Sequence, residues 1–316
     1  MRNLRTQEEI MATWKGDPEK PVVSICCITY NHEPYIEDAL EGFLIQDTDF
    51  PFEILIHDDA STDRTADIIR EYEAKYPKLI KPIYQVENQY SKGNRATMIV
   101  FPLCAGKYIA VCEGDDYWCD PSKLSKQTAY LEMNDDVVIS SHDAFIIDED
   151  RKKVKDSKLP DSHKRDYSSN ELKQGKGWLL TMNLMIRNIA IPEIPERRMV
   201  KNGDNFLVSI LGQYGGSHHH DDIKPSAYRL HAGGVWSALP DQIKIEEQIN
   251  TWLWIYRYYQ RIGDKECAAV YWSRFLNKVV QGSSKKSLLM LVIRNSIPER
   301  LISMLRPIKK SLFKDA

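Results

Sequence analysis

The sequence lacks the features that would place it at once in several large protein classes. It has no apolar run near the roughly 18–20 residues that span a bilayer, and residues 1–20 are polar, so we expect no transmembrane helix and no secretory signal. Its six cysteines form no CxxC pair, which favours small buried side chains in a reducing cytoplasm over a zinc site. The formal net charge is only −2, so no overall field favours nucleic acid as a partner.

The small net charge hides an uneven distribution along the chain. Residues 268–316 carry ten Lys or Arg against two Asp or Glu, a net charge of +8, which leaves −10 for the remainder. Basic residues alternate there with Leu, Ile, Met and Phe, as in helices that lie on anionic lipid, but a helix docked on its own domain has the same pattern. We therefore expect a cytoplasmic protein, either free or at the inner face of the cytoplasmic membrane through its C-terminal helices.

Strand-like and helix-like segments alternate within residues 21–112. The strand candidates are near-continuous apolar runs, as expected for strands buried on both faces. The strand candidates are 21–29, 52–58, 79–86 and 107–112, and the helix candidates between them are 34–46, 64–75 and 95–104. This alternation predicts an α/β fold with a mostly parallel central sheet flanked by helices.

Polar clusters follow three of these strand candidates. The clusters are Thr29-Tyr30-Asn31, Asp58-Asp59 and Asp115-Asp116. Because ligands bind outside the carboxyl ends of parallel strands, we expect the three clusters to lie close together. Two adjacent carboxylates repel each other unless a cation lies between them, and Mg²⁺ or Mn²⁺ commonly combines such carboxylates with diphosphate oxygens. The sequence therefore predicts a divalent-metal and diphosphate site at this edge of the sheet.

These clusters, extended by two later segments, resemble the inverting family 2 glycosyltransferases with the GT-A (Rossmann-like) fold, in a bacterial polysaccharide branch. The resemblance covers residues 21 to about 237. It rests on Thr29–Asn31, Asp58–Thr65, Gly114–Pro121, Asn202–Phe206 and Tyr228–Trp236. One position departs from the family pattern, since Gly203 stands where the first residue of an acidic pair is usual, and the match there depends on Asp204 alone.

The resemblance implies roles for the matched residues. Asp59 would hydrogen-bond the nucleotide base, Asp115 would contact the ribose, and Asp116 would ligate Mn²⁺ or Mg²⁺. Asp204 would be the general base that takes the proton of the acceptor hydroxyl, and His231 a further metal ligand. The other nucleotide contacts would be Thr29, Tyr30, Asn31 and Arg95. The donor or acceptor contacts would be Lys92, Trp118, Arg229 and Trp236.

Several of these residues have a structural alternative that the sequence leaves open. Asp204 could cap the helix that begins near it, His231 and Trp236 could be buried in the core, and Lys92 and Arg95 could be solvated surface charges. The run of three histidines and two aspartates at 218–222 looks like a metal cluster. Because consecutive residues of an extended chain point to opposite faces, we expect no metal there.

The expected organisation has three parts. Residues 1–20 form an N-terminal extension, and residues 21–240 form the GT-A catalytic domain. Within that domain, residues 21–120 are the nucleotide-binding half and residues 121–240 the acceptor-binding half, which includes a long polar loop at 148–174. Residues 241–316 form a basic, helical C-terminal extension.

The function implied is metal-dependent, inverting transfer of a sugar from a nucleotide-sugar to a saccharide or polyprenyl-linked saccharide in bacterial surface glycan biosynthesis. UDP is the default nucleotide, with GDP and dTDP as alternatives; neither the sugar nor the oligomeric state follows from the motifs. A non-catalytic module that binds nucleotide-sugar or glycan is the main alternative. A sugar nucleotidyltransferase or a dinucleotide oxidoreductase would need a Gly-rich loop after the first strand, and residues 29–33 lack one.

Overall fold

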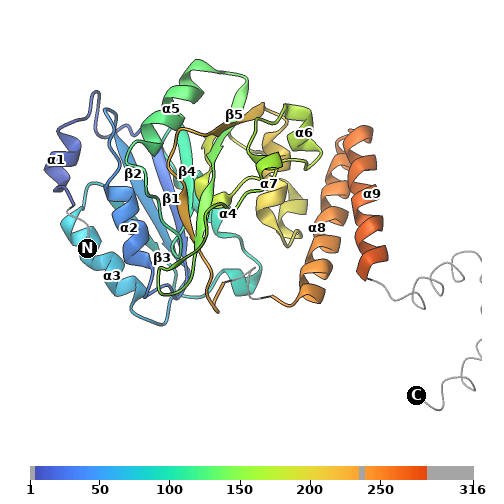
Figure 1. Cartoon of the computed structure of the whole chain (residues 1–316), viewed down its shortest axis with the longest axis horizontal. Coiled ribbons are helices and arrows are strands. Elements are labelled where there is room, and N and C mark those ends of the chain that lie inside the picture. Colours follow the sequence, from blue (N-terminus) through green and yellow to red (C-terminus); the bar gives the residue numbers. More distant parts are fainter. Residues whose placement is uncertain (1–3, 235–238, 283–316) are drawn as a thin grey trace, which may run out of the picture. The chain divides into compact units, whose positions relative to one another are not determined.

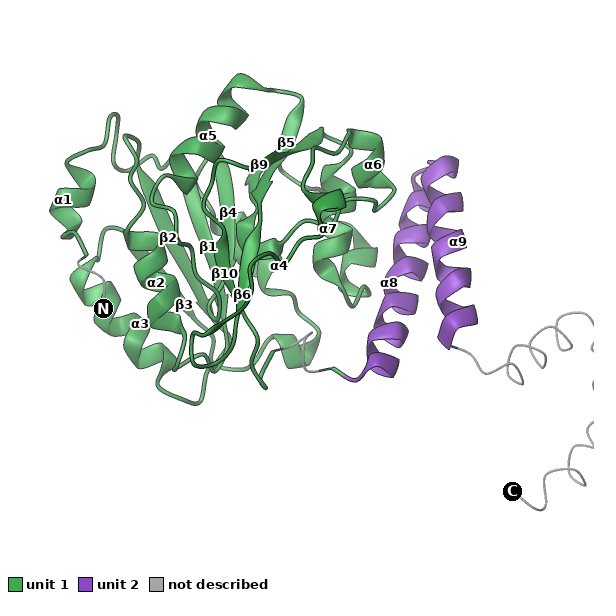
Figure 2. Cartoon of the chain, viewed as in Figure 1, with its two compact units in different colours: residues 1–239 green, residues 240–316 purple. Residues whose placement is uncertain are grey.

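A computed structural model describes residues 4–234 and 239–282 of the 316-residue chain. The chain divides into two compact units, residues 1–239 and 240–316, and each is described here by itself (Figures 1 and 2). Residue Trp236 and most of the basic tail, both singled out in the sequence, lie outside the described residues.

A seven-stranded sheet forms the centre of the first unit, in the order β3-β2-β1-β4-β8-β5-β9 (Figure 1). Strands β1 to β4 pair in parallel, β8 runs antiparallel to both of its neighbours, and β9 is parallel to β5. The strands are β1 (Val23–Thr29), β2 (Phe52–Asp58), β3 (Ile80–Tyr84), β4 (Tyr108–Glu113), β5 (Val137–His142), β8 (Met185–Arg187) and β9 (Gly216–His220). The mostly parallel α/β sheet predicted from the sequence is confirmed.

Helices cover both faces of this sheet, so two separate apolar clusters form. Neighbouring residues of β1 face opposite sides, with Ile25 in one cluster and Cys26 in the other, and both are fully buried. Continuous apolar runs in the strands are the consequence of this double burial. The helices of the first unit are α1 (Gln7–Met11), α2 (Ile36–Leu44), α3 (Thr65–Lys75), α4 (Ala96–Val100), α5 (Lys123–Met133), α6 (Ser169–Lys173) and α7 (Gly203–Leu211).

A smaller sheet brings a late part of the chain to the end of β4. Its order is β10-β6-β7, and a bridge between Tyr117 and Ala227 joins β10 to the segment that follows β4. The strands are β6 (Ala144–Ile147), β7 (Lys153–Lys155) and β10 (Ser226–Arg229). Residues 226–231 therefore lie beside the acidic segment at 113–116.

The segment at 148–174 is not the long irregular loop that its polar sequence predicts. It contains β7, a short 3₁₀ helix η3 (Asp161–His163) and α6. The Asp143 carboxylate accepts hydrogen bonds from the Leu159 backbone N–H at 3.0 Å and from the Ser157 hydroxyl at 2.5 Å, which fixes the path of the segment. A capping box between Ser168 and Glu171 starts α6.

Short 3₁₀ helices complete the first unit. The helix expected at 95–104 is shorter than predicted, because Pro102 follows α4 and the chain continues as a 3₁₀ turn. Another such turn directly precedes β8. The remaining 3₁₀ helices are η1 (Tyr90–Lys92), η2 (Phe101–Leu103), η4 (Thr181–Asn183) and η5 (Pro195–Arg198).

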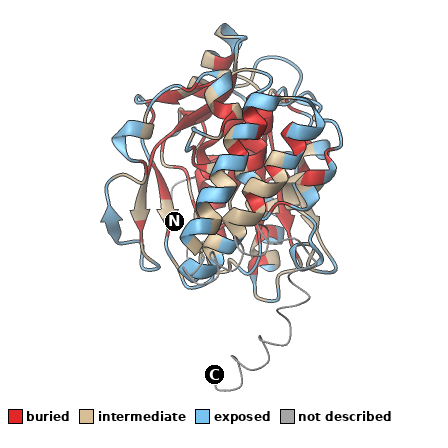
Figure 3. Cartoon of the chain, turned by 90° about the vertical axis from the view of Figure 1, so that its right-hand side faces the viewer, coloured by how far each residue is buried: buried red, intermediate tan, exposed pale blue. Residues whose placement is uncertain are grey.

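The second unit contains a pair of helices, α8 (Asp241–Arg261) and α9 (Lys265–Gly282), as the sequence predicts. Gly263, with φ of +81°, makes the turn between them. Aromatic side chains hold the pair together, since the Tyr259 and Tyr271 rings stack with centroids 5.6 Å apart. Exposed residues recur along both helices (Figure 3). None of the helices within the described ranges has both the length and the apolar character needed to cross a bilayer.

Candidate active site

The parallel strands end together, which brings the polar clusters to one edge of the sheet. Thr29 pairs with Asp58 across β1 and β2, and Ile28 pairs with Glu113 across β1 and β4. After β1 the chain turns through Asn31 in the left-handed conformation, with φ of 53°. The Asn31 side chain accepts a hydrogen bond from the Thr62 backbone N–H at 2.8 Å, which links the loops after β1 and β2. The expected convergence of the clusters is therefore observed.

Two glycines permit the close approach of the acidic segment. A Cβ atom at Gly114 would lie 2.6 Å from the Thr29 hydroxyl oxygen, and one at Gly42 in α2 would lie 2.9 Å from the Trp118 backbone nitrogen. Both distances are shorter than any ordinary contact. The absence of a side chain at these two positions therefore sets how closely residues 113–118 pack against β1 and α2.

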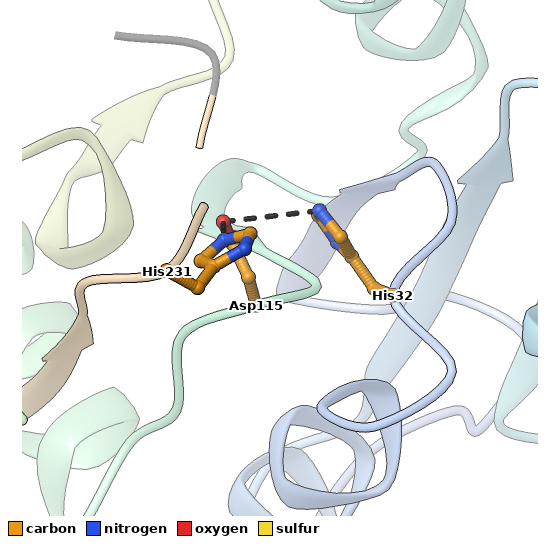
Figure 4. Close-up of side chains that lie close together, drawn as sticks. All are labelled: His32, Asp115 and His231. Atoms are coloured by element: carbon orange, nitrogen blue, oxygen red, sulfur yellow. Dashed lines mark hydrogen bonds and ion pairs between the residues drawn. The ribbon is translucent and has the colours of Figure 1, made fainter. Parts of the chain in front are cut away.

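Asp115 meets two histidines that come from distant parts of the chain (Figure 4). Its Oδ2 lies 2.9 Å from His231 Nε2 and 3.8 Å from His32 Nε2. His231 follows β10, and His32 follows β1, where its Nδ1 lies 3.2 Å from the Thr29 hydroxyl. Among the described residues, these three form the group of His, Cys, Asp and Glu side chains with the spacing of metal ligands.

The protonation of this group suits a cation. Burial lowers the pKa of His32, which favours the neutral imidazole that a metal requires. Burial acts to raise the pKa of Asp115, but its hydrogen bond with His231 and the nearby histidine charges outweigh burial, so the pKa is lowered and the carboxylate stays ionised. Two imidazole nitrogens and one carboxylate oxygen suit a transition ion such as Mn²⁺ better than Mg²⁺, which prefers oxygen ligands.

Asp116, the metal ligand expected from the sequence, is not a member of this group of three described residues. Its Oδ1 accepts a hydrogen bond from the Arg229 backbone N–H at 2.8 Å, and the residue is 3% exposed. Burial, with the charges of Asp115 and Glu113, holds the pKa of Asp116 well above its ordinary value. The structure thus brings Asp115 to the histidines, and it places Asp116 where it fixes β10 against the acidic segment.

Arg229 is buried and supports the surrounding elements through its side-chain contacts. Its buried guanidinium pairs with Asp38 in α2 at 2.7 Å, and its Nε donates to the Asp115 backbone carbonyl at 3.0 Å. The same group lies over the Tyr35 ring, 4.7 Å from the centroid. These contacts tie α2, β10 and the acidic segment together.

The two residues expected at the nucleotide base, Asp59 and Tyr30, follow the neighbouring strands β2 and β1. The Asp59 carboxylate accepts hydrogen bonds from the backbone N–H groups of Gln89 and Tyr90, at 2.7 and 3.0 Å, and so orders the chain after β3. Tyr30 is 43% exposed beside it. Lys92 forms an exposed ion pair with Glu87, which matches its alternative as a surface charge.

Asp204 lies in the first turn of α7, with its side chain accessible to solvent. Surrounding protein nevertheless desolvates the carboxyl and raises its pKa above the ordinary value. Burial, with the charges of Asp115 and then Asp204, raises the pKa of Glu113 to about 8. Since the charges of Asp115 and Asp204 both act on Glu113, the three carboxyl groups lie within electrostatic range of one another.

Sequence reasoning missed two charged residues near these carboxyl groups. Glu113 is the first acidic residue of the segment, and its position one residue before the Gly114 turn could have indicated it. Lys158 belongs to the segment expected to be an irregular loop, and its Nζ lies 3.3 Å from the centroid of the Tyr228 ring. Burial lowers the pKa of Lys158, against the opposing effect of Asp116 and Glu113. No local pattern marks Lys158, because it reaches the site through the tertiary fold.

The structure also gives the positions of Trp118, Arg95 and the three histidines of β9, which the sequence had singled out. Trp118 is fully buried, and its indole N–H donates to the Met182 carbonyl at 2.7 Å, so it is part of the core. Arg95 lies against α7, where its guanidinium donates to the Val200 carbonyl. Within the described ranges, the group with metal-ligand spacing does not include the three histidines of β9.

Comparison with known proteins gives a consistent result. A family model described as "Glycosyl transferase family 2" matches residues 24–186. The uncharacterized protein Rv1520 of Mycobacterium tuberculosis is 39% identical over 228 residues, which cover 71% of this chain and 64% of that protein. The chain therefore spans less than two thirds of the length of that relative.

Two further matches carry names that describe an activity or a ligand. The Escherichia coli protein WfaP, named as a UDP-Glc:alpha-D-GlcNAc-diphosphoundecaprenol beta-1,3-glucosyltransferase, is 34% identical over 130 residues, covering 41% of this chain and 48% of WfaP. The crystal structure of S. aureus TarS 1-349 in complex with UDP-GlcNAc superposes with a TM-score of 0.56 at 18% identity, covering 83% of this chain and 73% of that one. At this identity the structural match establishes the fold, which is GT-A.

Proposed function

The chain belongs to glycosyltransferase family 2, and from that premise we propose that it transfers a sugar from a nucleotide-sugar to a saccharide or lipid-linked saccharide acceptor. The observation that carries the proposal is the meeting of Asp115, His32 and His231 at the ends of the parallel strands. The charge of Asp204 acts on Glu113, in the same acidic segment as Asp115. The pathway we propose is bacterial surface glycan biosynthesis, and the diphosphoundecaprenol-linked acceptor in the name of WfaP supports a lipid-linked acceptor.

Asp115, His231 and His32 would hold the divalent ion, and their two nitrogen donors favour Mn²⁺ over Mg²⁺. A bound ion there would neutralise the diphosphate as negative charge builds on the leaving group. Asp59 and Tyr30 would receive the nucleotide base at the end of β2. UDP is the proposed nucleotide, supported by the donor named for WfaP and by the ligand of the TarS structure.

Asp204 would carry the proton transfer. The acceptor hydroxyl attacks the anomeric carbon from the side opposite the diphosphate, and its proton passes to the Asp204 carboxylate. A bond forms between the acceptor oxygen and the anomeric carbon while the bond from that carbon to the diphosphate oxygen breaks, so the configuration inverts in one step. Lys158, on which the charges of Asp116 and Glu113 act, would offset part of the negative charge there.

Isothermal titration calorimetry with UDP, with and without Mn²⁺, tests the proposal. We expect Mn²⁺ to tighten UDP binding and His231→Gln to reduce that gain about tenfold or more, because it removes one donor of the metal group. His218→Gln is the matched control, since His218 lies on the edge strand β9 and stacks on Tyr130. Equal UDP affinity with and without Mn²⁺ would contradict the metal site.

The same titrations separate the proposal from its alternatives. A protein that binds no nucleotide but retains glycan would be a non-catalytic module. If UDP binds, a panel of nucleotide-sugars, assayed for hydrolysis and for thermal shift, identifies the donor.

The proposed location is the cytoplasm, with peripheral contact to the inner face of the membrane. Helix α9 exposes Trp272, Leu276 and Val280 at four-residue spacing, which places them along one stripe of the helix. A stripe of this kind beside basic residues suits an interfacial helix. The basic residues after Gly282, which prompted the idea, lie outside the described part of the chain.

A further inference from the structure

Tyr35 contacts the metal group of Asp115, His32 and His231 without belonging to it. The centroid of its ring lies 4.8 Å from that of His231 and 6.4 Å from that of His32. The two imidazole rings are 5.9 Å apart, at an angle of 86°. Tyr35 is the N-cap residue of α2, whereas the histidines follow β1 and β10. Three rings from separate parts of the chain therefore pack together, at distances typical of aromatic pairs.

The orientation of His231 depends on this packing more than that of His32 does. A histidine that binds a metal usually keeps its orientation through a hydrogen bond of its second ring nitrogen. His32 has such a contact, since its Nδ1 lies 3.2 Å from the Thr29 hydroxyl. Among the described residues, the hydrogen bond of the His231 ring is the one between its Nε2 and Asp115, and its Nδ1 has no partner. The other contacts of the ring are aromatic.

The hydrogen bond between His231 and Asp115 cannot persist when both residues bind a cation. The two atoms that form it, Nε2 and Oδ2, are the atoms that would face the ion. A nitrogen that binds a metal has no proton to share with the carboxylate. Packing must then orient the His231 ring, and Tyr35 is the nearer of its two ring neighbours.

Tyr35 is itself held in place by α2 and β10. The buried Arg229 guanidinium lies over the ring, 4.7 Å from its centroid, and pairs with Asp38 at 2.7 Å. The Tyr35 backbone N–H donates to the His32 carbonyl at 2.8 Å, and its carbonyl accepts from the Asp38 N–H at 2.9 Å. Among the described residues the Tyr35 hydroxyl has no hydrogen-bonding partner. The ring, and not the hydroxyl, therefore makes the contacts.

We propose that Tyr35 is a positioning residue, whose ring holds the imidazoles of His231 and His32 where their nitrogen atoms meet a divalent ion. The proposal rests on the proposed function, since it concerns the metal site that the function needs. Without the ring, His231 gains rotamer freedom, and metal binding must then restrict it at a cost in entropy. Because the nitrogen donors favour Mn²⁺ over Mg²⁺, Tyr35 supports the binding of Mn²⁺ more than that of Mg²⁺.

Calorimetric titration of UDP into the full-length protein at a series of Mn²⁺ concentrations tests the role. The Mn²⁺ concentration that gives half of the full gain in UDP affinity measures the affinity for the metal. We expect Tyr35→Ala to weaken Mn²⁺ binding about tenfold or more, which is typical when a metal ligand loses an outer contact. Tyr35→Phe keeps the ring and should restore the wild-type value. Tyr214→Ala, at a 43% exposed tyrosine after α7, is the matched control.

The same titrations with Mg²⁺ separate positioning from a general structural effect. Damage to the fold would weaken the binding of both metals in equal proportion, whereas misplaced imidazoles should reduce the advantage of Mn²⁺ over Mg²⁺. The affinity for UDP without metal should not change. Thermal melting shows whether each variant is folded, and Tyr35→Leu, which fills the space without a planar ring, replaces Tyr35→Ala if that variant does not fold.

Three results would overturn the positioning role. They are equal Mn²⁺ affinity of the wild type and Tyr35→Ala, an equal loss for Mn²⁺ and Mg²⁺, and a loss in Tyr35→Phe as large as that in Tyr35→Ala. In each case the proposed function stands, because UDP binding by the wild type still depends on the metal. If Mn²⁺ does not tighten UDP binding by the wild type, the metal site of the proposed function fails, and the role of Tyr35 fails with it.

Discussion

Asp204 combines solvent access with a raised pKa, which are the two properties that a general base for a sugar hydroxyl needs. The N-cap residue of α7 is Asn202, whose side chain makes no capping hydrogen bond, so Asp204 is not the N-cap residue itself. Its carboxylate nevertheless accepts hydrogen bonds from the backbone at the start of the helix. Replacing Asp204 with Asn keeps the shape of the side chain but removes its charge, so this change distinguishes a general base from a capping residue.

We predict that Asp204→Asn lowers the transfer rate about 10²- to 10⁴-fold while UDP binding with Mn²⁺ is unchanged. Because burial raises the pKa of Asp204, wild-type activity should rise with pH as the carboxyl loses its proton, with a midpoint above that of a free aspartate. Transfer assays over a pH series and UDP calorimetry measure both effects. Asp161→Asn, at an exposed residue that pairs with Lys164, is the control, and near-normal turnover of Asp204→Asn would leave it a capping role only.

Lys123 is a buried lysine that the proposed chemistry does not use. Its Nζ donates to the Gln127 side-chain oxygen at 2.6 Å and lies 4.1 Å from the centroid of the Trp118 ring. Burial lowers the pKa of Lys123 from its ordinary 10.5 to about 7. Between these two values the unfolded chain binds a proton that the folded protein does not, so folding stability should rise with pH across that window.

We predict that Lys123→Met removes this part of the pH dependence. The stability of the wild type should increase by up to about 1.4 kcal/mol per pH unit from pH 7 upward, relative to the variant, because that is the free energy of one unit of pKa difference. Urea denaturation at pH 7, 8 and 9 measures the difference. Parallel stability curves for the two proteins would mean that Lys123 keeps its ordinary pKa when folded.

At the scale of single residues, the sequence could not show which of two adjacent carboxylates, Asp115 or Asp116, lies beside the histidines. The sequence placed two carboxylates at the end of β4, and the structure has them there. Which of the two faces the histidines depends on the pairing of Asp116 with the Arg229 backbone, 113 residues away. Nothing in the local sequence specifies that contact, and the same applies to Lys158.

Strand β10 brings residues from late in the chain to the candidate active site. The bridge at Tyr117 and the hydrogen bond to Asp116 hold the strand against the acidic segment. The side chain of Arg229 is 1% exposed and shares Asp38 with Arg151, whose side chain is 58% exposed and 2.9 Å from the same carboxylate. The chain therefore contains a buried and an exposed ion pair to a common partner.

We predict that Arg229→Gln lowers the free energy of unfolding by about 3–5 kcal/mol, because it leaves Asp38 with an incomplete set of buried partners. Arg151→Gln should cost no more than about 1 kcal/mol, since an exposed ion pair contributes little. Urea denaturation of both variants gives the comparison. Similar costs for the two changes would show that burial does not distinguish these pairs.

At the level of elements, the apolar runs predicted β1 to β4 nearly to their ends, and a helical extension was predicted where α8 and α9 lie. Burial of these strands on both faces produces a pattern that is readable from the sequence alone. The regular structure within 148–174 was not predicted. Hydrogen bonds to Asp143 fix this segment, and they leave no hydrophobic periodicity in a polar sequence. The Ser168–Glu171 capping box was a local indication of α6 that could have been used.

At the scale of the whole molecule, the two units divide the proposed tasks. Unit 1 contains the candidate active site, and unit 2 contains the exposed apolar stripe of α9, which is formed by Trp272, Leu276 and Val280. The residues after Gly282 carry most of the positive charge of the tail. A basic, apolar tail at the end of such a unit would be attracted to anionic lipid headgroups.

We predict that the full-length protein sediments with liposomes that contain anionic lipid, and that a chain ending at Gly282 binds them several-fold more weakly. Electrostatic attraction falls with salt, so raising the ionic strength should release most of the full-length protein. Liposomes of neutral lipid are the control. Equal sedimentation of the two chains would remove the proposed membrane contact of the tail.

The hydrogen bond from the Arg229 backbone to Asp116, and the contact of His231 with Asp115, also bear on how the protein is made. Ribosomes deliver a chain from its N-terminus, and contacts between distant positions form slowly. Strands β1 to β4 are synthesised well before residues 226–231 leave the ribosome. The proposed metal group is then completed as one of the last events of biosynthesis, because unfinished copies lack His231.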